Sequence, residues 1–145
     1  MGCELPSIDV SAAVLVKGNR VLIAQRPAGD PLEGKWEFPG GKVNSGECPR
    51  ACLKRELVEE LNIHARVGSF LGTSSYGYGD RKVTLLVFVA KIQTGRLTPL
   101  FHSEFRWISV DELLDHDLAP ADIPVAKRLI SGRWPLPDPD DDILS

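Results

Sequence analysis

Residues 40–63 of the 145-residue chain read GGKVNSGECPRACLKRELVEELNI. Near the end of this stretch, the spacing of Glu56, Glu59 and Glu60 places them on one face of a predicted helix. Leucines at positions 53, 57 and 61 follow a neighbouring face, which is typical of the side that packs on a core. Like charges at this spacing destabilise a helix by roughly 0.2–0.5 kcal/mol per i,i+4 pair. Two explanations fit: a solvated acidic surface, or a hard cation such as Mg²⁺ that offsets the repulsion.

The residues before the predicted helix favour the second explanation. Glycines at positions 40, 41 and 46 bound a loop, and Pro49 stands in the first helical turn, where a missing N–H costs nothing. Glu47 lies near the positive end of the helix, and Arg55 is placed to hold a carboxylate in one rotamer. A glycine-bounded loop leading into such a helix suits a phosphate group together with a metal ion.

The spacing of these residues resembles the Nudix signature, G-x5-E-x7-R-E-U-x-E-E-x-G-U, in which U is aliphatic. Gly41, Glu47 and residues 55–63 match it, except that Asn62 replaces the last glycine. That glycine ends a helix, and Asn is the next best residue for a left-handed C-terminal cap. The resemblance covers about residues 10–132.

The resemblance implies an α+β Nudix fold, in which a mixed β-sheet is sandwiched between helices and the catalytic motif forms a loop–helix–loop. A chain of 145 residues is expected to form one domain, which we place at residues 1–134. Residues 135–145, rich in proline and aspartate, are predicted to be an acidic and poorly ordered C-terminal tail.

Apolar alternation and turn residues predict the remaining elements. A turn at residues 18–19 is expected to join two strands into a hairpin, and residues 73–80 are predicted to be a flexible turn. The strand at residues 82–91 is apolar enough to be central and buried on both faces. The predicted strands are residues 10–17, 20–25, 64–72, 82–91 and 105–108, and two further helices are residues 110–114 and 123–130.

Within the Nudix family, residues 25–42, 80–85 and 118–125 look similar to the MutT-like subgroup. That resemblance implies hydrolysis of a nucleoside triphosphate to the monophosphate and pyrophosphate, with Mg²⁺ or Mn²⁺ as cofactor. The best known substrate of the subgroup is 8-oxo-dGTP, which implies sanitisation of the nucleotide pool. Two alternatives stay open: hydrolysis of another nucleoside diphosphate derivative (CTP or dCTP, a dinucleoside polyphosphate or ADP-ribose), and a catalytically silent nucleotide-binding module.

The resemblance also assigns residues to the site. The predicted catalytic residues are Arg55, Glu56, Glu59 and Glu60, with Glu56 as the favoured general base. The predicted metal ligands are the Gly40 carbonyl, Glu56, Glu59 and Glu60. The predicted substrate-binding residues are Arg26, Glu37, Phe38, Gly40, Lys42, Tyr78 and Asp122.

Several of these roles have alternatives. MutT-like enzymes often carry a metal-binding glutamate on a later loop, but Phe101 stands there, so either Glu104 or His102 replaces it or the site holds fewer metal ions. Asp122 stands where the family commonly reads the base with Asn. It is either a plain helix cap or an acceptor for guanine or cytosine, and it also donates if burial protonates it. The aromatic rings at positions 38 and 78 either stack on a base or pack in the core.

The charge, the N-terminal residues and the cysteine content limit the kinds of binding partner that we expect. A net charge of −3 argues against a sequence-independent grip on nucleic acid polymers, which needs a basic face. The N-terminus shows neither a secretory signal nor a membrane span, so we expect a cytoplasmic protein without a membrane partner. Three cysteines without zinc spacing indicate reduced thiols. The sequence leaves the oligomeric state open between monomer and dimer.

Overall fold

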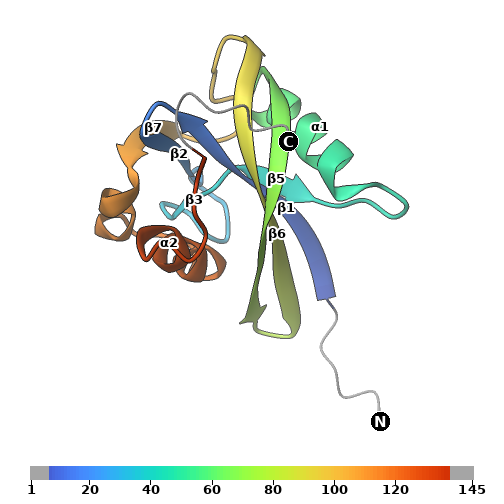
Figure 1. Cartoon of the computed structure of the whole chain (residues 1–145). Helices are drawn as coiled ribbons and strands as arrows, with labels where there is room; N and C mark the ends of the chain where they lie inside the picture. The colour runs from blue at the N-terminus through green and yellow to red at the C-terminus, as the bar shows by residue number, and fades with distance from the viewer. Residues whose placement is uncertain (1–6, 138–145) are drawn as a thin grey trace.

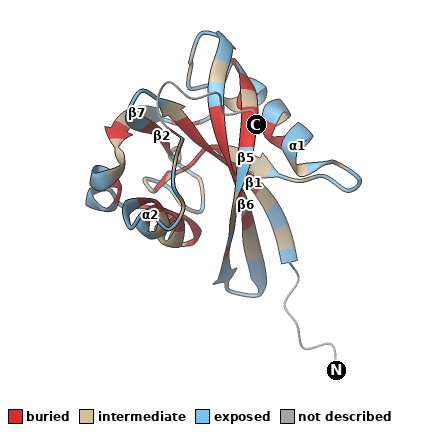
Figure 2. Cartoon of the chain, viewed as in Figure 1, coloured by how far each residue is buried: buried red, intermediate tan, exposed pale blue. Residues whose placement is uncertain are grey.

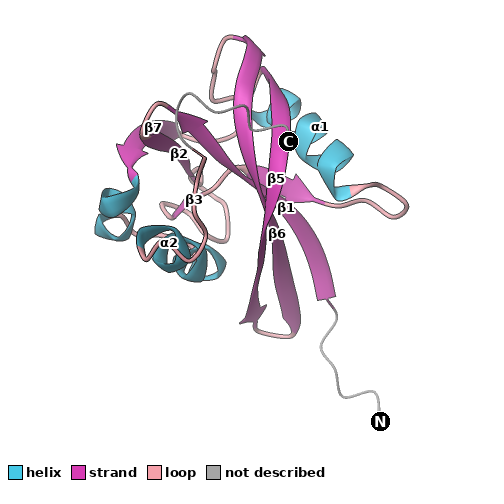
Figure 3. Ribbon diagram, in the orientation of Figure 1, coloured by secondary structure: helices cyan, strands magenta, loops and turns pink. Residues whose placement is uncertain are grey.

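The computed structural model describes residues 7–137, which form a twisted mixed sheet with helices on both of its faces (Figure 1). The strands are β1 (Ser7–Lys17), β2 (Arg20–Gln25), β3 (Trp36–Glu37), β4 (Gly40–Lys42), β5 (Ile63–Tyr78), β6 (Arg81–Gly95) and β7 (Glu104–Ser109). The helices are α1 (Pro49–Leu61) and α2 (Ile123–Ile130), with the 3-10 helices η1 (Val110–Asp115) and η2 (Pro120–Asp122) before α2 (Figure 3). The predicted α+β fold is confirmed.

Strand β1 is the centre of the sheet. It runs parallel to β6 on one side and antiparallel to β4 on the other, while its last residues pair with β2. Strand β5 pairs antiparallel with β6, and β2 also pairs with β3 and β7. Because Gly40 pairs with Ala12, the start of the motif lies directly against the central strand. A Cβ on Gly40 would overlap the Ser11 carbonyl oxygen, so only glycine permits this approach.

Side chains alternate across β1 and divide the core into two clusters. Ala12 and Val14 pack on the side of α2 and the 3-10 helices, while Ala13 and Leu15 pack on the side of α1. The leucine repeat of α1, predicted to face the core, is fully buried in the second cluster at Leu53, Leu57 and Leu61 (Figure 2). The opposite side of α1 is therefore free to present its glutamates.

The ends of α1 follow the sequence expectation. Pro49 is its first residue, and Asn62 closes it in the left-handed conformation with φ of 60°. The Asn62 N–H donates to the carbonyl oxygens of Leu57 and Val58. The replacement of the usual glycine by Asn is thus accommodated by a genuine C-terminal cap.

The predicted flexible turn at residues 73–80 is wrong. Strand β5 continues to Tyr78, which pairs with Arg81, and the turn is confined to residues 79–80. Register shifts near Phe70 and Gly72 interrupt the pairing, and Gly72, with φ of 147°, lies close to the Trp134 ring. Strand β5 continues past these register shifts because its neighbour β6 is long and rich in β-forming residues. The backbone of β6 therefore goes on pairing with β5 beyond the bulge.

Other predicted elements are present with shifted ends. Strand β6 lies between β1 and β5, as expected for the central apolar strand, and it extends to Gly95. The helix predicted at residues 110–114 is the 3-10 helix η1, and the helix at residues 123–130 is α2. Most of the predicted tail, residues 138–145, lies outside the described residues, so the domain boundary stays a prediction. Leu136 packs against the first core cluster.

Candidate functional site

Arg55 gathers the carboxylates of the motif. Its Nε and Nη2 donate to the two carboxylate oxygens of Glu47 at 2.8 and 2.9 Å. Its Nη1 donates to Glu56 at 2.9 Å and to Glu59 at 3.2 Å. The hydrogen bond from Arg55, followed by one from the Asn44 N–H, lowers the pKa of Glu47 to about 2. The loop and the helix are therefore tied together by one guanidinium, which holds more carboxylates than the one expected from the sequence.

Glu60 lies deeper than the other motif carboxylates. Its Oε1 is buried and has no hydrogen-bond partner among the described residues. Burial, and then the charges of Glu37 and Glu56, raises the pKa of Glu60 to about 8. A buried carboxylate without a hydrogen-bond partner is stabilised either by protonation or by a nearby cation.

The donor set fits the divalent metal that the Nudix resemblance implies. Glu56, Glu59 and Glu60 supply oxygen ligands, and the orphaned Oε1 of Glu60 is a buried acceptor that a hard cation would satisfy. Within residues 7–137, no three or more His, Cys, Asp and Glu side chains are placed as a ready metal cluster. The hydrogen bonds from Arg55 account for this, because they turn Glu56 and Glu59 toward the guanidinium.

Glu37, whose charge helps to raise the pKa of Glu60, also lines a cavity of about 470 Å³, which we call the Asp122 cavity. Arg26, Glu37, Tyr78 and Asp122, four of the predicted substrate-binding residues, line its wall. The other lining residues are Val10, Asp30, Pro31, Leu32, Asp80, Arg81, Val83, Leu85, Ala119 and Ala121. The structure thus brings together residues that are up to about a hundred positions apart in the sequence.

Asp122 is 4% exposed, and its carboxylate Oδ1 accepts a hydrogen bond from the Phe38 N–H at 2.9 Å. It occupies the N-cap position of α2, but its side chain makes no capping hydrogen bond, so the plain-cap alternative does not describe it. Burial, and then the charge of Glu37, raises the pKa of Asp122 well above its usual range. A raised pKa favours the neutral acid, which both donates and accepts, more than in an exposed aspartate.

Strand β5 holds the peptide before Asp122. The Ser74 hydroxyl donates to the Ala121 carbonyl at 2.8 Å, and the Ala121 N–H donates to the Tyr78 hydroxyl at 3.1 Å. Nothing in the polar run around Ser74 identified this contact in the sequence. Tyr78 is half-buried in the cavity wall with its hydroxyl engaged, so its ring supports η2 as well as lining the cavity.

Arg26 and Glu37 form a second ionic group at the cavity. Arg26 donates to both carboxylate oxygens of Asp30 at 2.7 and 2.9 Å, and to Glu37 at 3.1 and 3.2 Å. His102 Nε2 lies 2.8 Å from the Glu37 Oε2. The sequence did not predict a role for Asp30, because it lies in the irregular segment between β2 and β3, where residue spacing does not indicate contacts.

The remaining predicted residues lie elsewhere. The Phe38 side chain is 3% exposed and belongs to the first core cluster, which is the packing alternative rather than the stacking one. Lys42 is exposed at the end of β4 and does not line the Asp122 cavity. The two residues suggested for the later loop have other partners, since Glu104 pairs with Arg106 and His102 with Glu37.

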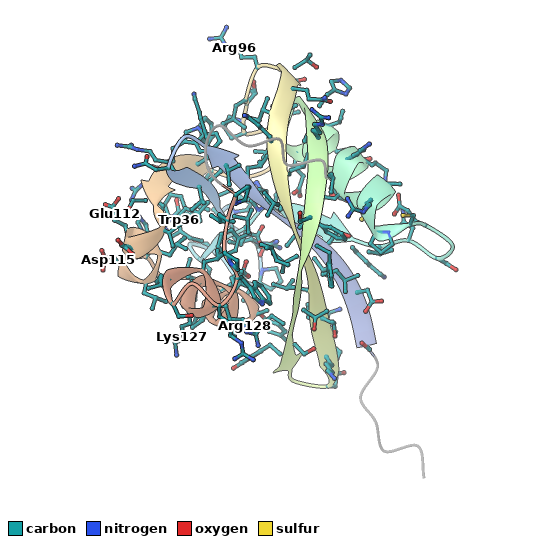
Figure 4. All side chains as sticks on the ribbon, viewed as in Figure 1. Trp36, Arg96, Glu112, Asp115, Lys127 and Arg128 are labelled. Carbon is teal, nitrogen blue, oxygen red and sulfur yellow. The ribbon has the colours of Figure 1, made fainter. Side chains whose placement is uncertain are left out.

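Charged side chains around α2 and η1 do not join the cavity. Glu112, Asp115 and Lys127 are exposed and point outward from this edge of the molecule (Figure 4). None of the helices in the described part of the chain is long and apolar enough to cross a membrane.

Comparisons with known proteins agree with this geometry. The NUDIX domain family matches residues 6–129. The chain is 38% identical to the CTP pyrophosphohydrolase of Escherichia coli over 126 residues, which cover 87% of this chain and 93% of that protein. It is 39% identical to the putative 8-oxo-dGTP diphosphatase 2 of Mycobacterium tuberculosis over 116 residues, covering 78% of this chain and 81% of that one.

Solved structures show the same architecture. The solution structure of the E. coli ORF135 protein superposes with a TM-score of 0.77 at 36% identity, covering 92% of this chain and 95% of that one. A crystal structure of MutT protein from Methanosarcina mazei gives a TM-score of 0.78 at 25% identity, covering 91% and 99%. With the motif, the fold and the relatives in agreement, the chain belongs to the Nudix hydrolase family and is a nucleotide pyrophosphohydrolase.

Proposed function

We propose that this enzyme hydrolyses a cytidine-type nucleoside triphosphate, CTP or dCTP, to the monophosphate and pyrophosphate. The observation that carries the base assignment is the buried Asp122, whose Oδ1 is fixed by the Phe38 N–H in the wall of the Asp122 cavity. The similarity to a CTP pyrophosphohydrolase supports the same choice. The 8-oxo-dGTP assignment expected from the MutT-like resemblance becomes the second candidate.

The motif side chains would hold the metal and the phosphates. Glu56, Glu59 and Glu60, with the Gly40 carbonyl, would bind Mg²⁺ or Mn²⁺, which neutralises phosphate charge and activates water when bound. Arg55 keeps Glu56 and Glu59 together through its Nη1, while Glu47 holds the other side of the guanidinium. Glu56, already the favoured general base, is partly buried beside Arg55 and within this group. The chain's own contribution is mainly positioning and electrostatics.

The chemistry of Asp122 selects the base. Because the Phe38 N–H binds Oδ1, a neutral Asp122 presents an acceptor at Oδ1 and a donor at Oδ2. Cytosine offers a matching edge, since its amino group donates and its ring N3 accepts. Uracil offers the reverse order, with an oxygen that accepts and an N3–H that donates. Adenine shares the cytosine pattern on a larger ring, so its nucleotides belong in the same test.

The test is a Mg²⁺-dependent hydrolysis panel of CTP, dCTP, UTP, ATP and 8-oxo-dGTP, with product identification. We expect a kcat/KM for CTP or dCTP about tenfold or more above that for UTP, because a mismatched buried polar group is costly. UTP is the matched control, since it keeps the size and charge of CTP. Equal turnover of CTP and UTP, or a clear preference for 8-oxo-dGTP, would overturn the base assignment.

A pair of variants tests the protonation state of Asp122. Asp122→Asn keeps an acceptor for the Phe38 N–H and a donor beside it, so it should preserve the cytidine preference. Asp122→Leu removes both groups and should abolish the preference while leaving metal-dependent hydrolysis. Loss of the preference in Asp122→Asn would mean that Asp122 binds as an ionised carboxylate.

The second candidate, 8-oxo-dGTP, has its own support. The chain is 39% identical to a putative 8-oxo-dGTP diphosphatase 2, and an ionised Asp122 would accept from the N1–H and amino group of a guanine. The same panel and the Asp122→Asn result separate this candidate from the first.

A further inference from the structure

We propose that His102 is a positioning residue for nucleotide binding, which fixes Glu37 as a hydrogen-bond acceptor in the wall of the Asp122 cavity. The inference rests on the proposed function, because it assigns a second contact to the same bound nucleoside. Cytosine carries two amino hydrogens, and Asp122 accepts only one of them through Oδ1. Glu37 lines the same cavity and is available for the other.

Sheet pairing brings His102 to Glu37. Strand β2 pairs with β3 on one side and β7 on the other, so that Gln25 faces both Trp36 and Glu104. Glu37 and the loop before β7 therefore meet at the same end of β2. There the His102 Nε2 lies 2.8 Å from Glu37 Oε2, although 65 positions separate them in the sequence.

The loop that carries His102, residues 98–103, is anchored on both sides. The Leu100 N–H donates to the Glu60 carbonyl at 2.9 Å, and the Ser103 N–H donates to the Gln25 carbonyl at 3.0 Å. The Phe101 ring packs edge-on against His102, with centroids 5.0 Å apart, and lies 5.3 Å from the Arg26 guanidinium carbon. The imidazole is therefore presented to Glu37 in one orientation.

Arg26 alone does not fix Glu37. Its Nε and Nη2 are both committed to Asp30 at 2.9 and 2.7 Å, and only Nη1 reaches Glu37, at 3.1 and 3.2 Å. The contact with His102 is shorter than either of these. Two donors approaching from different elements define the carboxylate plane better than the one Nη1 group of Arg26, whose two contacts with Glu37 are both longer, at 3.2 and 3.1 Å.

Core packing does not explain a histidine here. Its side chain is 0% exposed, and its Nδ1 is buried without a hydrogen-bond partner among the described residues. An apolar side chain would fill the same space without leaving a polar atom unsatisfied. What an apolar residue cannot supply is a ring nitrogen 2.8 Å from the Glu37 carboxylate, which in the tautomer that carries hydrogen on Nε2 donates to Oε2.

The experiment compares His102→Leu, which removes the donor, with His102→Gln, whose amide reaches close to the position of Nε2. We expect His102→Leu to raise KM for CTP about tenfold and to reduce the preference for CTP over UTP, with kcat changed much less. His102→Gln should restore most of the affinity. His64→Leu, at an exposed position on β5, is the matched control.

A thermal unfolding measurement separates positioning from structure. Because the leucine removes an unsatisfied buried nitrogen, His102→Leu should be at least as stable as the wild type while binding nucleotide more weakly. A lower stability with unchanged KM would make His102 merely structural and overturn the inference. The effect of His102→Leu should also vanish in a Glu37→Gln background, and a persistent effect would show that His102 does not act through Glu37.

Binding of α,β-methylene CTP in Ca²⁺, a non-hydrolysable combination, separates the two proposals. The base assignment fails if the wild type neither binds this analogue nor hydrolyses CTP but turns over another nucleotide. In that case the His102 variants are compared on that other nucleotide. If CTP is bound and hydrolysed while His102→Leu matches the wild type, the inference about His102 fails alone.

Discussion

Gly41 is a glycine because another side chain occupies the position of its Cβ. A Cβ built there would overlap the carboxylate end of Glu56. The first glycine of the motif therefore serves one of the motif glutamates directly. Cys52, whose thiol contacts the Gly41 and Lys42 carbonyls at 3.4 Å, packs beneath the same turn.

Gly41→Ala should reduce kcat/KM by about a hundredfold, since Glu56 must leave the place where Arg55 holds it. The fold should be retained, because Glu56 is a flexible side chain and the φ of Gly41 is not positive. Hydrolysis kinetics and circular dichroism check this expectation. Gly77→Ala, where a Cβ meets nothing within 4 Å, is the comparison variant and should behave like the wild type.

The second half of β5 is the element that positions Asp122. Residues beyond the bulge at Gly72 bring Ser74 and Tyr78 against the Ala121 peptide, which immediately precedes Asp122, the residue proposed to read the base. The sequence predicted a flexible turn at residues 73–80. In the structure this segment is a strand that holds the peptide next to Asp122, on which the proposed base specificity depends. Ser74 and Tyr78 contact backbone groups of η2. The side chains of η2 therefore do not indicate these contacts in the sequence.

Ser74→Ala should lower the free energy of unfolding by about 1–3 kcal/mol, because it leaves the buried Ala121 carbonyl without its donor. It should also raise KM for the preferred nucleotide. Denaturant unfolding and steady-state kinetics measure the two effects. Ser75→Ala removes only an exposed contact with Thr84 and should change neither, so equal effects of the two variants would contradict the assigned role.

At the scale of the whole molecule, several buried acids share one region between α1 and the Asp122 cavity. Glu37 is a cause of the raised pKa of both Glu60 and Asp122, so the side proposed to read the base and the side proposed to bind the metal are electrostatically linked. In the absence of a cation, burial favours the protonated forms of Glu60 and Asp122. Stability, protonation and metal binding are therefore coupled in this fold.

The metal-free enzyme should lose stability as pH rises from about 4.5 toward 8. Glu60 has a folded-state pKa raised to about 8, so its stabilising contribution is complete at low pH and is lost as the proton leaves. One such group changes the free energy of unfolding by at most about 1.4 kcal/mol per pH unit. Denaturant unfolding in chelator across this range measures the slope.

Glu60→Gln should flatten this slope, because the amide does not titrate, and it should abolish the stabilisation that Mg²⁺ gives the wild type at pH 8. Glu104→Gln, at an exposed pair with Arg106, is the reference for a carboxylate removed elsewhere. An unchanged slope in Glu60→Gln would show that another acid governs the pH dependence.

The sequence by itself determined the motif helix, its caps and the family. These are local properties: the glutamates and leucines separate by helical spacing, Pro49 begins α1, and Asn62 ends it in a left-handed cap. The positions of five strands along the chain also followed from apolar alternation and turn residues, whereas the short strands β3 and β4 were not predicted. Such features depend on neighbours within a few positions, which a sequence displays directly.

Only the tertiary structure decided what surrounds Asp122 and Glu37. The Phe38 N–H on Asp122, His102 on Glu37 and Ser74 on Ala121 join residues 84, 65 and 47 positions apart. Their meeting depends on the parallel β1–β6 pairing, the continuation of β5 and the shared partner β2. The elevated pKa of Asp122 has the same origin, because burial is a property of the packed molecule and not of any short stretch of chain.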